Sequence, residues 1–117
     1  ASVFVEMMTQ VERGGEEVLV PTVRELVLQR LAKWQGEAMP LGQGWLDKVL
    51  QEIEVEERPA ARLALLTAFA SYRVDTTVIE DFRRLYPMDS ALLKATAWAS
   101  FAAARRVGGW LLPHGLS

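Results

Sequence analysis

Residues 91–112 read ALLKATAWASFAAARRVGGWLL, and this stretch decides the fold. Asp89 can cap the start of a helix here, and Pro113 cannot continue one. The middle of the stretch, residues 95–104, holds only Ala, Thr, Trp, Ser and Phe, so neighbouring backbones can come close to it. The sequence therefore predicts a long central helix with the other helices wrapped around it.

Small side chains recur every four residues along this predicted helix, at Ser100, Ala104 and Gly108. Residues four apart share one helix face, so the three predict a narrow face for close packing. On this interpretation, Ala104→Leu would overpack the interior and lower the free energy of unfolding by about 1–3 kcal/mol.

Five further helices are predicted upstream, from apolar residues at helical spacing. Gly14 and Gly15 are expected to end the first of them, with an extended linker over residues 16–20. Thr22 and Glu25 have the spacing of a capping box at the start of the second. The first three helices are expected over residues 2–13, from Thr22 to an end at Gly36, and over 45–53, with a loop over 37–44. The fourth is expected over residues 60–72, and the fifth between Asp75 and Pro87.

The helix over residues 60–72 is apolar on nearly every side. A helix of this kind is buried all round, so it should pack directly on the 91–112 helix. Asp75 should cap the helix that follows. Together the patterns predict an all-α bundle of about six helices around a long Ala-rich C-terminal helix, forming one domain over residues 1–117.

The composition indicates a folded protein without thiol chemistry. Half of the 117 residues are hydrophobic and 24% are charged, as in ordinary globular domains. The absence of cysteine excludes disulfides, thiolate metal sites and cysteine catalysis, and a net charge of −2 gives no nucleic-acid footprint. The uncharged run between Lys94 and Arg105 is ten residues, against the roughly twenty that a membrane-spanning helix needs. No signal peptide is visible, so we expect a cytoplasmic protein.

Few residues suit a catalytic or metal site. The single histidine, His114, lies in the tail after the last predicted helix, and such tails are usually mobile. Zinc sites need cysteine or several histidines, and di-metal sites in bundles need Glu-x-x-His pairs, which the sequence lacks. We therefore expect no metal and no cofactor.

Two arginine pairs, Arg83-Arg84 and Arg105-Arg106, leave two interpretations open. One is a pocket for a small anionic ligand between the last two long helices, because guanidinium groups match carboxylate geometry. The other is ordinary ion pairing with nearby acids. The residues assigned to the pocket are Tyr72, Arg73, Arg105 and Arg106, and the candidate acids are Glu80, Asp81 and Asp89.

Trp98 shares a helix face with Lys94 and Arg105, which should be the outer face of the last helix. A large aromatic side chain among charged ones is typical of the core of a protein interface. The three residues therefore predict a surface for self-association. Burial of Trp98 under the N-terminal helix is the alternative, since tryptophan is commonly buried in any case.

From Val23 onward, three segments resemble the helical fold of the alkylhydroperoxidase AhpD-like, or carboxymuconolactone decarboxylase-like, family. They are VRELVLQRLAKW, ARLALLTAFASYRVDTTVIEDFRR and DSALLKATAWASFAAARRVGGWL. The resemblance covers roughly two-thirds of the chain and implies association through helices. Peroxidase members use a Cys-x-x-Cys motif and a nearby histidine, which this chain lacks, so no family site residue is carried over.

We expect a non-catalytic helical protein, a homo-oligomeric interaction or scaffold module. The alternatives are a protein that binds a small anionic ligand, and a degenerate AhpD-like enzyme without thiol chemistry. Neither nucleic acid nor a membrane is expected as a partner.

Overall fold

A computed structural model describes residues 3–34 and 44–111 of the chain and confirms the all-α fold class. No strand occurs within these two ranges. The helices are α1 (Val3–Val18), α2 (Pro21–Lys33), α3 (Gly44–Leu50), α4 (Arg58–Phe69), α5 (Thr76–Leu85) and α6 (Asp89–Leu111), with single 3₁₀ turns η1 (Val55–Glu57) and η2 (Ser71–Arg73).

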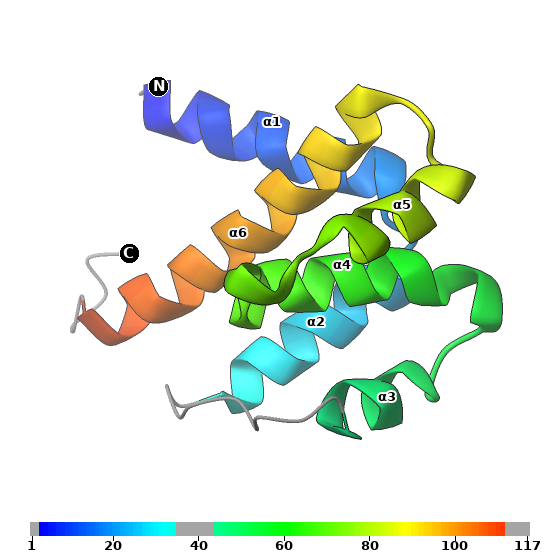
Figure 1. Cartoon of the computed structure of the whole chain (residues 1–117). Coiled ribbons are helices and arrows are strands. Elements are labelled where there is room, and N and C mark those ends of the chain that lie inside the picture. Colours follow the sequence, from blue (N-terminus) through cyan, green and yellow to red (C-terminus); the bar gives the residue numbers. More distant parts are fainter. Residues whose placement is uncertain (1–2, 35–43, 112–117) are drawn as a thin grey trace.

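The centre of the bundle is α4, which packs against α2, α3, α5 and α6 (Figure 1). Its side chains at Leu63, Leu65 and Leu66 are buried although they point to different sides of the helix. Burial on all sides confirms the prediction made from the apolar sequence of this segment. The helix ends at Phe69, earlier than predicted, and η2 follows.

The last helix matches its predicted extent, with a shift at its start, and packs against α1, α2, α4 and α5, but the fully buried helix at the centre is α4 and not α6 as predicted. Asp89 does not stand before the helix as a cap but lies in its first turn, where its carboxylate accepts a hydrogen bond from Arg83. Negative charge is favourable there in either position, because the first turn carries unpaired backbone N–H groups. Leu112 and Pro113 lie outside the described residues.

The predicted small-residue face of α6 is wrong. Ser100 and Ala104 are exposed, and a methyl group added at Gly108 would meet no atom within 4 Å. The face of α6 that packs inward carries Ala95, Trp98, Ala99 and Ala102 instead. A spacing of four shows which residues share a face, but alanine and serine are compatible with water as well as with a core, so the spacing could not orient that face.

The first helix does not stop at its glycines. Instead, α1 continues through Gly14 and Gly15 to Val18, and both glycines are buried. Gly15 lies so close to Trp98 that an added Cβ would be 2.2 Å from Cδ1 of the indole. Glycine is used here for the close approach of two helices, and not for a turn.

Helix caps were predicted with mixed success. At α2 the N-cap is Val20, with Pro21 at the first position, so Thr22 lies inside the helix and the predicted capping box is wrong. At α5 the prediction is confirmed, because Asp75 Oδ1 accepts a hydrogen bond from the Val78 amide at 3.0 Å. Residues 37–43 of the predicted loop lie outside the described residues.

Candidate functional site

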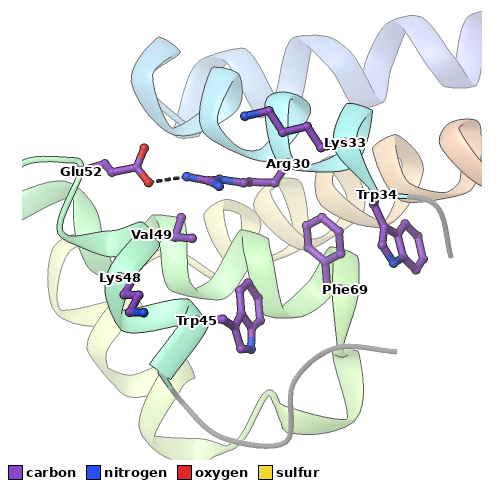
Figure 2. Close-up of a pocket in the computed structure, with 8 residues that line it drawn as sticks. All are labelled: Arg30, Lys33, Trp34, Trp45, Lys48, Val49, Glu52 and Phe69. Atoms are coloured by element: carbon purple, nitrogen blue, oxygen red, sulfur yellow. Dashed lines mark hydrogen bonds and ion pairs between the residues drawn. The ribbon is translucent and has the colours of Figure 1, made fainter. Parts of the chain in front are cut away.

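A cavity of about 350 Å³ lies between α2, α3 and the end of α4 (Figure 2). Each of the three elements contributes side chains to it. Its lining consists of Arg30, Lys33, Trp34, Trp45, Lys48, Val49, Glu52 and Phe69.

Three aromatic rings form one wall of this cavity. The ring of Phe69 is central: its centroid lies 5.4 Å from that of Trp34 and 6.1 Å from that of Trp45. Both contacts are edge-to-face, with interplanar angles of 76° and 74°, the arrangement that the ring quadrupoles favour. The two tryptophans therefore stand on either side of one phenylalanine and present apolar surface to the cavity (Figure 2).

The remaining lining is mostly cationic. Arg30, Lys33 and Lys48 are basic and Glu52 is acidic, so the lining carries a net charge of +2 in a chain whose net charge is −2. Arg30 and Glu52 form an ion pair through Nη2 across the opening of the cavity. This site is a cation-rimmed aromatic cavity, and sequence analysis did not identify it.

A signal for the cavity was nevertheless present in the sequence. Arg30, Lys33 and Trp34 are spaced i, i+3 and i+4, which places them on one side of α2. Trp45, Lys48 and Glu52 have the matching spacing i, i+3 and i+7 in the next helical segment. Two consecutive segments thus each offer a tryptophan beside cations. That the two sides face one another could only be seen in three dimensions.

The four residues predicted to bind an anion engage different parts of the fold. Tyr72 is 83% exposed in η2, and Arg73 follows it in the same turn. Arg105 donates to Glu12 of α1 at 2.7 Å. Arg106 turns instead to the C-terminal end of α2, where its Nη2 donates to the backbone oxygens of Ala32 and Trp34 at 3.0 and 2.8 Å. The guanidinium groups of Arg105 and Arg106 therefore point to separate helices.

The other arginine pair follows the ion-pair interpretation. Arg83 binds Asp89 and Arg84 lies 3.4 Å from Asp81. Both arginines keep a large share of their side chains in water. They stabilise the surface of α5 modestly, as exposed pairs do.

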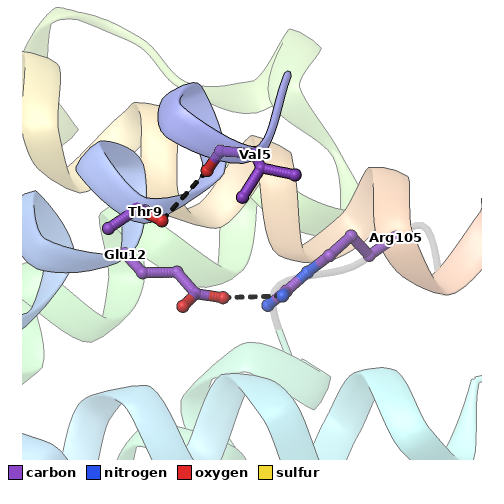
Figure 3. Close-up of polar contacts among 4 residues, drawn as sticks. All are labelled: Val5, Thr9, Glu12 and Arg105. Atoms are coloured by element: carbon purple, nitrogen blue, oxygen red, sulfur yellow. Dashed lines mark hydrogen bonds and ion pairs between the residues drawn. The ribbon is translucent and has the colours of Figure 1, made fainter. Parts of the chain in front are cut away.

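The surface predicted for self-association is covered by α1 of the same chain. Trp98 is only 5% exposed and lies against Gly15. Lys94 pairs with Glu17 at 2.6 Å, and Arg105 pairs with Glu12 (Figure 3). Burial under the N-terminal helix, the alternative for Trp98, is therefore correct. The two cations did not mark an outer face, because acids on α1 meet them.

The described residues contain neither a cluster of metal ligands nor a membrane-spanning helix. Within residues 3–34 and 44–111, no group of three or more His, Asp or Glu side chains could hold a metal ion. None of the helices described is long and apolar enough to cross a membrane. His114 lies outside the described residues.

One curated protein supports the resemblance drawn from the sequence. Alkyl hydroperoxide reductase Rv2159c of Mycobacterium tuberculosis is 38% identical to the chain over 93 residues, which are 80% of the chain. The aligned part is 27% of that protein, so the chain spans little more than a quarter of the length of this relative. No protein-family profile and no solved structure matches the chain.

Proposed function

We propose that this chain is a non-catalytic, AhpD-like helical module that acts by associating with copies of itself. The similarity to an alkyl hydroperoxide reductase supports the kinship, and the absence of cysteine removes thiol chemistry from this chain. The observation that carries self-association is an apolar stripe on α1 that is covered for only part of its length.

The stripe consists of Val3, Met7, Val11 and Gly14, which follow one another at spacings of three and four residues. Its C-terminal part packs on α6, where a Cβ added at Gly14 would lie 3.0 Å from Cγ of Lys94. Its N-terminal part continues beyond that contact, and there Val3 is 72% exposed and Met7 55% exposed. When a partner covers the exposed part of such a stripe, apolar surface is removed from water and the free energy of the system falls.

The surface continues from α1 onto α6. A shallow groove of about 240 Å³ lies between the two helices and is lined by Val11, Gly14 and Leu93, among others. Leu93 on its rim is 70% exposed. We call Val3, Met7 and Leu93, with this groove between them, the α1–α6 edge. A second copy that presents the same edge would bury it in a symmetric interface, as most homo-oligomers do.

Light scattering coupled to size-exclusion chromatography tests the proposal. The wild-type chain should have at least the mass of a dimer at micromolar concentration, and the double variant Val3→Ser/Met7→Ser should be a monomer with unchanged helix content. The matched control is Val55→Ser/Met88→Ser, which removes the same two residue types at exposed positions outside the α1–α6 edge. A monomeric wild type, or equal loss of mass in both double variants, would refute the proposal.

Anion binding by Tyr72, Arg73, Arg105 and Arg106 is a second candidate function with less support. Arg105 and Arg106 already donate to oxygen atoms of α1 and α2, and a ligand would have to replace those contacts. Titration of phosphate or acetate into the chain, compared with the Arg73→Gln variant, tests this candidate.

A further inference from the structure

We propose that the cation-rimmed aromatic cavity between α2 and α3 binds a small organic anion, a carboxylate attached to an aromatic or apolar body. This goes beyond the proposed self-association, because none of the residues lining the cavity belongs to the α1–α6 edge. The inference depends on three separate features of the cavity: its aromatic wall, the partly exposed guanidinium of Arg30, and its excess of positive charge.

The aromatic wall determines the body of the ligand. Trp34, Phe69 and Trp45 expose ring surface side by side, with Val49 adding an aliphatic contact. A planar ring laid against this wall would replace water on apolar surface and contact the rings through edges or faces. The volume of about 350 Å³ lies at the lower end of the range for small-molecule sites, so the body is limited to one or two rings or a short aliphatic chain.

The guanidinium of Arg30 determines the polar end of the ligand. Its Nη2 pairs with Glu52, and 32% of the Arg30 side chain remains exposed beside the aromatic wall. A ligand carboxylate can therefore approach the exposed part of the same guanidinium and share it with Glu52. Arg30 Nε and Trp45 Nε1 are fully covered by protein atoms, and neither has a hydrogen-bond partner among the residues that the structure describes.

The charge of the lining selects an anion over a neutral molecule. Lys33 and Lys48 stand on opposite sides of the opening, on α2 and α3, and Glu52 is already paired with Arg30 (Figure 2). A carboxylate near Arg30 would accept charge-assisted hydrogen bonds, which are roughly twice as strong as neutral ones. A cation in the cavity would instead meet an unfavourable field, because the lining carries a net positive charge.

Isothermal titration calorimetry with 2-naphthoate and 2-naphthamide tests the inference. The two probes share one ring system, and only the first is charged. We expect 2-naphthoate to bind at micromolar to millimolar concentration and at least about tenfold more tightly than 2-naphthamide, since a charged acceptor gains more from Arg30 than a neutral one. No binding of 2-naphthoate at millimolar concentration, or equal affinity for the two probes, would overturn the inference.

Matched variants then locate the site. Arg30→Gln should weaken 2-naphthoate binding by at least about tenfold. It should also reduce the difference in affinity between 2-naphthoate and 2-naphthamide. Arg84→Gln removes the same charge from the exposed surface of α5 and should leave the affinity unchanged. Because Arg30→Gln also releases Glu52, Lys48→Gln serves as a second variant whose structural role is smaller, and it should weaken binding in the same direction. Equal affinity in Arg84→Gln, Lys48→Gln and Arg30→Gln would place the ligand elsewhere and overturn the assignment.

A final comparison separates this inference from the proposed self-association. The Val3→Ser/Met7→Ser variant should bind 2-naphthoate as the wild type does, whatever its oligomeric state. Loss of binding in this variant, with unchanged helix content, would show that the anion site depends on the α1–α6 edge and would contradict the cavity as its location.

Discussion

Gly15→Ala should destabilise the chain although it improves the helix in which it lies. In an open helix interior, replacing glycine by alanine adds about 1 kcal/mol of stability. At Gly15, however, the added Cβ would lie 2.2 Å from Cδ1, 2.4 Å from Cγ and 2.9 Å from Cβ of Trp98. Cγ and Cβ belong to the root of the indole side chain, so a rotation at its tip cannot relieve the overlap.

The cost follows from what has to move. Either α1 shifts away from α6 or Trp98 leaves its position, where it is only 5% exposed. Overpacking of this kind costs about 1–3 kcal/mol, and occasionally more. Since the contact is far shorter than van der Waals distance, we take the upper part of this range. After the gain in helix propensity is subtracted, Gly15→Ala should lower the free energy of unfolding by about 1–2 kcal/mol.

Two other glycines in the same chain provide controls for chemical denaturation followed by circular dichroism. An added Cβ at Gly108 would have nothing within 4 Å, so Gly108→Ala should raise the free energy of unfolding by up to about 1 kcal/mol. At Gly14 the nearest atom is Cγ of the flexible Lys94 side chain, at 3.0 Å, and Gly14→Ala should fall between the two. If Gly15→Ala is as stable as Gly108→Ala, the close contact between α1 and α6 does not exist in solution.

Four further outcomes are expected. Asp75→Ala should lower the free energy of unfolding by about 1 kcal/mol, because the Val78 amide loses its cap, and thermal melting should show it. Arg106→Gln should cost about 1–3 kcal/mol in a denaturant titration, since the end of α2 loses the donor to the Trp34 carbonyl. Ala104→Leu should change the free energy of unfolding by no more than about 0.5 kcal/mol, because this position is exposed. A larger loss of stability would show that the small-residue face of α6 is packed against another helix. Finally, the purified chain should not turn over an alkyl hydroperoxide with a dithiol as reductant, because it has no cysteine; turnover in a coupled assay would contradict this.

Structural features that depend only on residues close together in the sequence could be predicted from the sequence. The burial of α4 follows from the absence of a polar side in its own residues, and the Asp75 cap follows from a pattern of four residues. The position of Trp98 depends instead on Glu12 and Glu17, which lie far from it in the chain and pair with its charged neighbours. Because the cations next to Trp98 could equally have faced water, the sequence alone could not decide between burial and an interface.

The candidate site shows the same limit. The tryptophans and cations around the cavity are ordinary surface or core residues when α2 and α3 are considered separately. Only the packing of both on α4, which brings Phe69 between Trp34 and Trp45, turns them into one lining. The arginines that did stand out, Arg105 and Arg106, were conspicuous in the sequence because they are adjacent, and the fold directs them to different helices.

The pairing of α1 with α6 also fixes an order of events on the ribosome. Glu17 and Lys94 are 77 residues apart, and Glu12 and Arg105 are 93 residues apart. At about 5–20 residues per second, α1 waits roughly 5–20 s after its own synthesis for the segment that covers it. Throughout that interval its apolar stripe is open to chaperones. Helix α1 therefore completes its packing only after α6 has been made.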